Sequence, residues 1–457
     1  MWLKFFFLWC VMANVYCWDI FKFSPLPRFD HEWWGPVHLK YQNDTRIRPF
    51  QMHFDEGMIQ DLRYRLKNHR PFTPPLEGVG FEYGFNTAYL DGWVDYWSDH
   101  YPFQKQEDYL NQFPQYKTNI QGLDIHFLWV RPEVPHHIEV VPLLLLHGWP
   151  GSVREFYETI PLLTKVSEYR DFAVEVIAPS LPGFGFSDAA IRPGLGATEM
   201  GVVLRNLMHR LGFKKFYVQG GDWGGYIGLS IVTLYPKEVL GYHSNLPTSI
   251  SPSALAIWAL GSIYPPLVVD PYLAKRMYPL LNIIYGLTRE TGYFHLQATK
   301  PDTLGVAMSD SPSGMLAYIL QLFSSATRRR FYNRADGGLD EIYTRDELID
   351  NLMIYWITNT FTTSSRIYAE TANLRNIKMG VFAIPTPVPT WTIHASDEIL
   401  YQSPTLLKIK FPNLLNSTIL NTGGHFLALE LPRVFADDVL HAIEAFRRYR
   451  KKNKLGY

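Results

Sequence analysis

Short apolar runs alternate with longer stretches of helical periodicity along most of the chain, and this alternation predicts its secondary structure. The apolar runs are bounded by Gly, Pro or polar residues, as buried strands usually are, and lie at 138–146, 215–219, 239–245 and 389–394. Apolar positions with the helical period of 3.6 recur at 198–211, 226–235 and 434–450. Strands and helices in alternation predict an α/β protein with a mostly parallel sheet and right-handed crossovers.

Two long segments interrupt this pattern. Residues 19–135 read as an extension with one amphipathic helix at 55–68, and residues 251–375 read as a helical lid inserted between core strands. We expect an α/β-hydrolase fold with a helical lid and an N-terminal extension. The expected parts are an N-terminal membrane anchor, the extension, the first part of the core, the lid and the second part of the core: 1–18, 19–135, 136–250, 251–375 and 376–457.

The hexapeptide Gly220-Gly-Asp-Trp-Gly-Gly225 stands between a predicted strand and a predicted helix. A strand, a tight glycine turn and a helix form the context of a nucleophile elbow, in which small neighbours allow one side chain to project over the sheet. That side chain would be Asp222. The alternative is a helix N-cap aspartate in an ordinary glycine turn.

An elbow nucleophile also needs oxyanion donors, an acid and a histidine, and segments in the expected order offer all three. The strand at 138–146 runs into His147-Gly-Trp-Pro-Gly-Ser152, whose Trp149 N–H could act with the Trp223 N–H as an oxyanion hole. Asp397 and Glu398 follow the strand at 389–394, and His425 lies in a glycine loop. Each acid could be a solvated loop residue and His425 one of fifteen unspecialised histidines, but their joint order favours catalysis.

An aspartate nucleophile has a chemical reason when the substrate is attacked at saturated carbon. A hydroxyl would form an ether that water cannot readily cleave, whereas a carboxylate forms an ester that a water deprotonated by His425 can hydrolyse. Epoxides and alkyl halides are the substrates that fit. An epoxide oxygen leaves as an alkoxide and needs a proton, which tyrosines of the inserted segment could supply.

Four motifs resemble the microsomal epoxide hydrolase family, most of all its insect juvenile hormone epoxide hydrolases. They are HGWPGS at 147–152, GGDWGG at 220–225, YFHLQATKPDTLG at 293–305 and GGHF at 423–426. The resemblance implies Asp222 as nucleophile, His425 as base and, from the family's spacing, Glu398 as the acid. It also implies Tyr293 and Tyr368 as the lid tyrosines, and a lipophilic epoxide, such as juvenile hormone or a xenobiotic, as substrate without metal or organic cofactor.

The composition of the chain limits the kinds of binding partner and cellular surroundings that we expect. The chain has 43 basic and 43 acidic residues, so no nucleic-acid partner is expected. Its two cysteines, Cys10 and Cys17, both lie in the apolar stretch at 5–18, which leaves no disulfide for the folded body. This stretch predicts a single N-terminal anchor in the endoplasmic reticulum or microsomal membrane, although it is also as short as a signal-peptide core.

The sequence therefore predicts an epoxide hydrolase that works through a covalent aspartyl ester. Two alternatives remain at this point. One is an enzyme of the haloalkane dehalogenase type, which would release halide instead of forming a diol. The other is a lipid-binding protein that has kept the hydrolase fold without turnover.

Overall fold

Six parallel strands form the centre of the computed structural model, which describes residues 29, 32–40 and 44–454. Three antiparallel strands extend one edge, and the order within this nine-stranded sheet of the described chain is β1-β2-β3-β5-β4-β6-β7-β8-β9. The strand bounds are β1 Arg48–Phe50, β2 Gln115–Ile120, β3 Leu123–Val130, β4 Glu139–Leu146, β5 Phe172–Pro179, β6 Phe216–Gly220, β7 Val239–Ser244, β8 Thr390–His394 and β9 Leu414–Ile419. The predicted α/β class with a mostly parallel sheet is confirmed.

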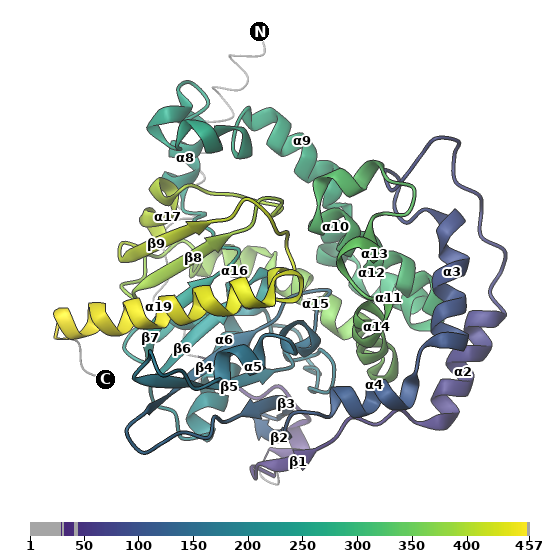
Figure 1. Cartoon of the computed structure of the whole chain (residues 1–457), viewed down its shortest axis with the longest axis horizontal. Coiled ribbons are helices and arrows are strands. Elements are labelled where there is room, and N and C mark those ends of the chain that lie inside the picture. Colours follow the sequence, from purple (N-terminus) through teal and green to yellow (C-terminus); the bar gives the residue numbers. More distant parts are fainter. Residues whose placement is uncertain (1–28, 30–31, 41–43, 455–457) are drawn as a thin grey trace.

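The central strands are buried on both faces, as parallel strands usually are. In β4, Leu143–Leu146 are all buried, and Leu144 pairs with Ile177 of β5 on one side and Val218 of β6 on the other. Helices α5 and α19 cover one face, and α6 and α7 pack together on the other (Figure 1). Their bounds are α5 Ile160–Thr164, α6 Ala197–Arg210, α7 Asp222–Leu234 and α19 Pro432–Lys452.

Helix α7 begins earlier than its sequence pattern predicts. The apolar periodicity suggested a start at Tyr226, but the helix starts at Asp222 and its first turn includes Gly224 and Gly225. A Cβ at Gly224 would lie 2.2 Å from the Leu146 carbonyl oxygen, so this glycine allows close contact between α7 and β4 rather than ending the helix. Asp222 is therefore fixed at the junction of β6 and α7.

Helices inserted between β7 and β8 form a separate layer, which Figure 1 shows beside the carboxyl ends of the central strands. We call α8–α16 the inserted segment. Its helices are α8 Pro252–Leu260, α9 Leu280–Glu290, α10 Gly292–Thr299, α11 Pro301–Asp310, α12 Pro312–Thr327, α13 Leu339–Ile342, α14 Arg345–Thr358, α15 Phe361–Thr371 and α16 Leu374–Met379. After β8 come α17 Pro404–Lys410 and α18 Leu427–Glu430.

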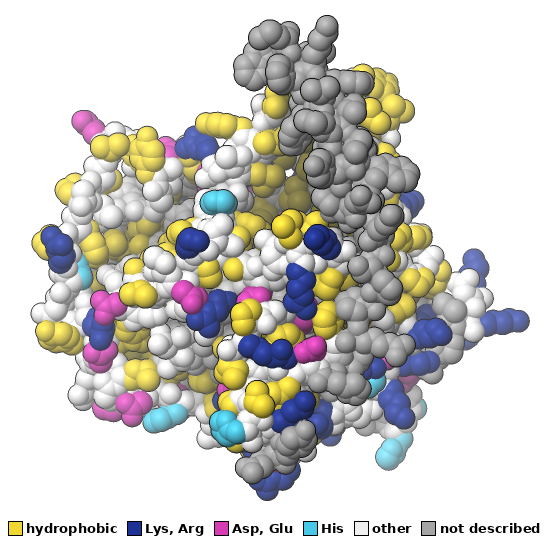
Figure 2. All heavy atoms as spheres, turned by 180° about the vertical axis from the view of Figure 1, so that it is seen from behind, with side chains coloured by type: hydrophobic (Ala, Val, Ile, Leu, Met, Phe, Trp, Pro, Cys, Tyr) yellow, Lys and Arg dark blue, Asp and Glu magenta, His cyan; other side chains and the backbone are white. Residues whose placement is uncertain are grey.

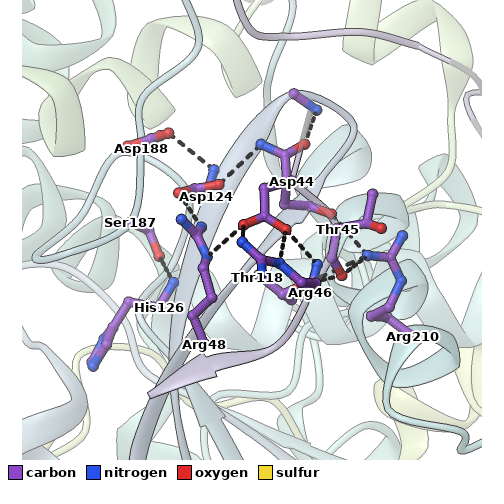
Figure 3. A network of polar contacts seen from close by, with 12 residues as sticks. Asp44, Thr45, Arg46, Arg48, Thr118, Asp124, His126, Ser187, Asp188 and Arg210 are labelled. Carbon is purple, nitrogen blue, oxygen red and sulfur yellow. Dashed lines mark hydrogen bonds and ion pairs between the residues drawn. The ribbon is translucent and has the colours of Figure 1, made fainter. Parts of the chain in front are cut away.

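The segment before the core contacts both the sheet and the inserted segment. Helices α2 Glu56–Lys67 and α3 Leu90–Asp95 pack on α12, and α4 Phe103–Leu110 packs on α14 (Figure 1). A polar network attaches β1 to its neighbours: Arg48 pairs with Asp124 of β3, and Arg210 of α6 donates to the Thr45 carbonyl over 2.7 Å (Figure 3). These contacts join the extension to the core.

The molecular surface mixes charge types. On the face opposite to that of Figure 1, basic side chains are interspersed with acidic and apolar ones (Figure 2). None of the helices within the described ranges is long and apolar enough to cross a bilayer. The anchor predicted at 1–18, with Cys10 and Cys17, lies outside the described residues.

Candidate active site

Asp222 occupies a turn whose backbone favours few residue types. Its φ is +47°, in the left-handed region, and the residue stands at the first position of α7. Close packing surrounds it: a Cβ added at Gly148 would lie 2.4 Å from the Asp222 Cβ and 2.5 Å from its Oδ1. The elbow that the sequence predicts thus holds the carboxylate against the loop that follows β4.

The backbone around Asp222 supplies hydrogen-bond donors. The Trp149 N–H donates to Asp222 Oδ1 over 2.8 Å. The Trp223 N–H, in the first turn of α7, makes no hydrogen bond to any residue in the described ranges. Donors at this position stabilise negative charge on a carboxylate or on a tetrahedral oxyanion. The structure therefore brings both predicted donor positions to Asp222, one of them already bonded to it.

His425 lies between two carboxylates. Its Nε2 is 3.5 Å from Asp222 Oδ2, and its Nδ1 is 2.7 Å from Glu398 Oε1. The Glu398 side chain is 2% exposed and that of His425 is 8% exposed, whereas Asp222 is 18% exposed. Asp397, the alternative acid, accepts instead from the Arg329 N–H and from the Ser396 hydroxyl. Of the two neighbouring acids, the geometry places Glu398 at the imidazole.

The two neighbouring carboxylates raise the pKa of His425. Burial disfavours the charged imidazole, but the Glu398 and Asp222 carboxylates outweigh it, so the pKa of His425 lies well above its usual value. The two carboxylates therefore favour the cationic form of the imidazole. Conversion of Asp222 to a neutral ester would remove one of the two anions and lower this pKa, which would make His425 a better base.

A third carboxylate, whose role the sequence does not reveal, shapes the loop that carries His425. The side chain of Glu430 is fully buried, accepts from the backbone N–H groups of Gly424 and Phe426, and pairs with Arg328 over 2.5 Å. Burial raises the pKa of Glu430 to about 7 despite Arg328. The only hint in the sequence was an acid shortly after the glycine loop, because Arg328 is about a hundred positions away.

Tyr293 of α10 and Tyr368 of α15 lie against Trp149, near enough to Asp222 for its charge to act on both phenols. The Trp149 ring stacks on Tyr293 at 5.6 Å and meets Tyr368 edge-on at 5.6 Å. Burial raises the pKa of both phenols, and the charge of Asp222 raises it further, so both hydroxyls keep their protons. The Tyr368 hydroxyl is buried without a hydrogen-bond partner among the described residues. The structure thus brings together both tyrosines that the sequence selected.

A cavity of about 310 Å³ extends from this group toward α9. Trp149, Tyr293 and His425 line its inner end. Most of its wall area is apolar and comes from residues such as Pro150, Ile283, Leu287, Leu322, Tyr332 and Phe426, while Arg289, Glu290, Arg329 and Asp397 also line it. The volume lies at the lower end of the range for small-molecule sites, and the mainly apolar walls suit a lipophilic ligand.

Comparisons with known proteins agree with this geometry. A family model described as "Epoxide hydrolase N terminus" matches residues 47–156, and one described as "alpha/beta hydrolase fold" matches residues 141–430. The chain is 54% identical to "Juvenile hormone epoxide hydrolase" of Bombyx mori over 93% of this chain and 92% of that protein. It is 40% identical to "Epoxide hydrolase 1" of Sus scrofa over 89% and 91% of the two chains.

Solved structures give the same result. The crystal structure of juvenile hormone epoxide hydrolase from the silkworm Bombyx mori superposes with a TM-score of 0.91 and covers 92% of this chain and 99% of that one. An epoxide hydrolase from Aspergillus niger, at 24% identity and a TM-score of 0.73 over 89% and 98% of the chains, shares the fold. The chain therefore belongs to the epoxide hydrolase family, as an enzyme that adds water to epoxides on an α/β-hydrolase fold.

Proposed function

We propose that Asp222 attacks a carbon of a lipophilic epoxide and forms an alkyl-enzyme ester. The observation that carries this assignment is the contact of His425 with both Asp222 and Glu398 at the inner end of an apolar cavity. Attack forms the bond between Asp222 Oδ2 and carbon while the carbon–oxygen bond of the epoxide breaks. Tyr293 and Tyr368 donate hydrogen bonds to the departing oxygen, and one of them transfers its proton. The cationic His425 then gives up its own proton, which restores that tyrosine and leaves a neutral imidazole.

In the second half-reaction, water attacks the carbonyl carbon of the ester, and its proton passes to His425 Nε2. Glu398 holds the imidazole through Nδ1 and stabilises the cation that forms. The N–H groups of Trp149 and Trp223 bind the tetrahedral oxyanion. Collapse breaks the bond between the carbonyl carbon and the alkyl oxygen, His425 returns the proton to that oxygen, and the diol leaves. The Asp222 carboxyl then passes the remaining proton of the water to His425, which restores the carboxylate.

Juvenile hormone is the substrate that we propose within this class. Support comes from the two relatives named juvenile hormone epoxide hydrolase from Bombyx mori and Manduca sexta, at 54% and 45% identity over more than nine tenths of this chain. The apolar cavity beside α9 suits an extended lipophilic chain whose epoxide reaches Tyr293 and His425, the residue in contact with Asp222.

A single-turnover reaction in heavy-oxygen water tests the mechanism. Because water attacks the ester carbonyl, the label should enter the Asp222 carboxylate first and reach the diol only in later turnovers. Asp222→Ala should abolish diol formation while a lipophilic epoxide still binds. Label that enters the diol in the first turnover would overturn the covalent path.

The same assay separates the alternatives. Halide release from alkyl halides without diol formation from epoxides would indicate dehalogenase chemistry. Binding of juvenile hormone by the unmodified protein without any turnover would indicate a carrier. Faster hydrolysis of other lipophilic epoxides than of juvenile hormone would move the proposal to xenobiotic substrates.

We also propose that the enzyme sits on the endoplasmic reticulum membrane through an anchor in residues 1–18. The apolar aromatic stretch at 5–18 supports this. Further support comes from Leu260, Ile263 and Leu267 at and after the end of α8, which are 63%, 82% and 76% exposed. Carbonate extraction of microsomes should leave the full chain in the pellet, and replacement of Phe5, Phe6 and Phe7 by serine should release it. Retention of that variant would contradict this anchor.

A further inference from the structure

A second, smaller cavity borders both Asp222 and His425 and shares Trp149, His425 and Phe426 with the substrate cavity. It offers about 20 Å³ to the centre of a water molecule, which is room for one. Gly148, Trp149, Asp222 and His425 form one side. The polar side chains of Glu155, Gln219 and Asn245 also line it. A water held here would lie next to both the carboxylate that becomes an ester and the imidazole that takes its proton.

The Glu155 carboxylate reaches this cavity by folding back over the loop that follows β4. Glu155 belongs to the short 3-10 helix η4 Val153–Phe156, and a Cβ added at Gly151 would lie 1.5 Å from Glu155 Oε1. Only a glycine at position 151 therefore leaves room for this carboxylate. The neighbouring Arg154 forms ion pairs with Asp350 and Glu158 and not with Glu155, so it does not neutralise the Glu155 carboxylate.

The carboxyl of Glu155 has no protein partner. It makes no hydrogen bond or ion pair with any residue between 44 and 454, although the charges of His425 and Asp222 act on it. Burial raises the pKa of Glu155 to about 8, with His425 lowering it and Asp222 raising it further. A largely buried carboxyl without a partner is costly, so such groups usually hold a water or serve in chemistry.

Gln219, which also lines this cavity, has an acceptor to spare. Gln219 donates through Nε2 to Asn245 Oδ1 over 2.9 Å, while its own Oε1 is buried without a partner among the described residues. A water between Glu155, Gln219 and Asn245 would satisfy groups that are otherwise unpaired. Buried waters typically make about three hydrogen bonds, which these side chains and His425 can provide.

We propose that Glu155 is a positioning residue that holds the hydrolytic water beside the Asp222 ester. This inference rests on the covalent mechanism proposed above. The water forms one hydrogen bond with the Glu155 carboxyl and directs a lone pair at the ester carbonyl carbon. One of its protons passes to His425 as the carbon–oxygen bond forms, the other stays on the attacking oxygen, and the later steps follow as described. Glu155 acts only in this half-reaction, because the attack on the epoxide needs no water.

The test measures the two half-reactions separately with styrene oxide as the probe. Rapid mixing, acid quench and intact-protein mass spectrometry give the rate at which the alkyl-enzyme forms and the rate at which it decays. Glu155→Ala should slow decay about 10- to 100-fold, as expected when a reacting group loses its position, and change formation by less than about threefold. The alkyl-enzyme should then accumulate in the steady state.

Glu155→Gln keeps the size of the side chain and one neutral acceptor oxygen, so its ester should decay faster than that of Glu155→Ala but more slowly than that of the unmodified enzyme. This variant also carries the test if the alanine variant does not fold. Glu158→Gln is the matched control, since Glu158 lies on the same loop but faces Arg154 and Tyr109. It should leave the ratio of the two rates unchanged.

Two outcomes would overturn the proposal. Equal loss of both rates in the Glu155 variants would mean that Glu155 only supports the loop, and unchanged decay would mean that the water is held elsewhere. Failure of the covalent mechanism itself is distinguishable, because then the unmodified enzyme would form a diol without any detectable alkyl-enzyme.

Discussion

Gly148 offers a direct test of how tightly Asp222 must be held. In Gly148→Ala the new methyl group would lie 2.4 Å from Asp222 Cβ, 2.5 Å from Oδ1 and 2.8 Å from Cγ. Carbon atoms in contact normally stay about 3.5–4.0 Å apart, so the carboxylate has to move by about 1 Å. Such a shift would break the 2.8 Å hydrogen bond from the Trp149 N–H to Asp222 Oδ1.

The expected size of the effect follows from this displacement. A shift of about 1 Å in a reacting group costs roughly 100-fold in rate, so kcat/KM for diol formation should fall by that factor. Overpacking of a buried site costs about 1–3 kcal/mol of unfolding free energy, which a domain of this size can tolerate. The activity loss should therefore greatly exceed the stability loss.

Gly225→Ala is the matched control within the same elbow. A Cβ at Gly225 would meet its nearest atom, the Gly220 carbonyl oxygen, at 3.4 Å, which is an ordinary contact. Because Gly225 lies inside α7, alanine should raise the unfolding free energy by up to about 1 kcal/mol and leave kcat/KM within about twofold. Steady-state kinetics and urea unfolding measure both quantities. Unchanged activity in Gly148→Ala, or equal loss in both variants, would refute this account of the elbow.

Three further changes test other parts of the structure. Tyr368→Phe should lower the rate of alkyl-enzyme formation about 100-fold, because it removes a proton donor. Tyr318 is the control: its hydroxyl donates to Gln297, and Tyr318→Phe should change this rate less than about twofold. Rapid-quench kinetics measure both rates, and equal effects would contradict the assignment. Asp350→Asn should cost about 3 kcal/mol in urea unfolding because it removes the fully buried anion that pairs with Arg154 and leaves only the partly exposed Glu158. The same change at the exposed Asp302 should cost less than about 1 kcal/mol, and equal costs would contradict this. Burial lowers the pKa of Lys410 from 10.5 to about 7, so between these values the unfolded chain binds more protons. Stability should therefore rise from pH 7 to 9 by up to about 1.4 kcal/mol per pH unit, and a profile that does not differ from that of Lys410→Met would contradict this.

Local chemistry explains why much of the sheet could be predicted from the sequence. The strands at 138–146 and 239–245 are apolar because both of their faces are buried, and they appear as Glu139–Leu146 and Val239–Ser244. The elbow was visible for the same reason, since its glycines are adjacent in the chain. The start of α7 was misplaced because Gly224 is there for contact with β4, which no local pattern reveals.

The sequence does not reveal the role of a residue when that role depends on partners far away in the chain. Glu430 shapes the His425 loop only together with Arg328, about a hundred positions earlier. Glu155 reaches the site because Gly151 leaves space for its carboxylate. Both acids look like ordinary surface residues in the sequence, because burial and pairing are set by the tertiary fold.

The adjacent pair Asp397 and Glu398 shows what decides between two similar candidates. The loop after β8 runs beside the glycine loop, with hydrogen bonds from the Ser396 and Asp397 N–H groups to the Thr422 and Gly423 carbonyls. This pairing places Asp397 toward the Arg329 N–H and leaves Glu398 facing the imidazole. The Ile399 N–H also donates to Glu398 Oε1 over 2.8 Å, so the carboxylate is fixed before it meets His425. A one-residue slip between these two loops would exchange the acids, which is why the register of the loops, rather than the type of either side chain, determines which one contacts the histidine.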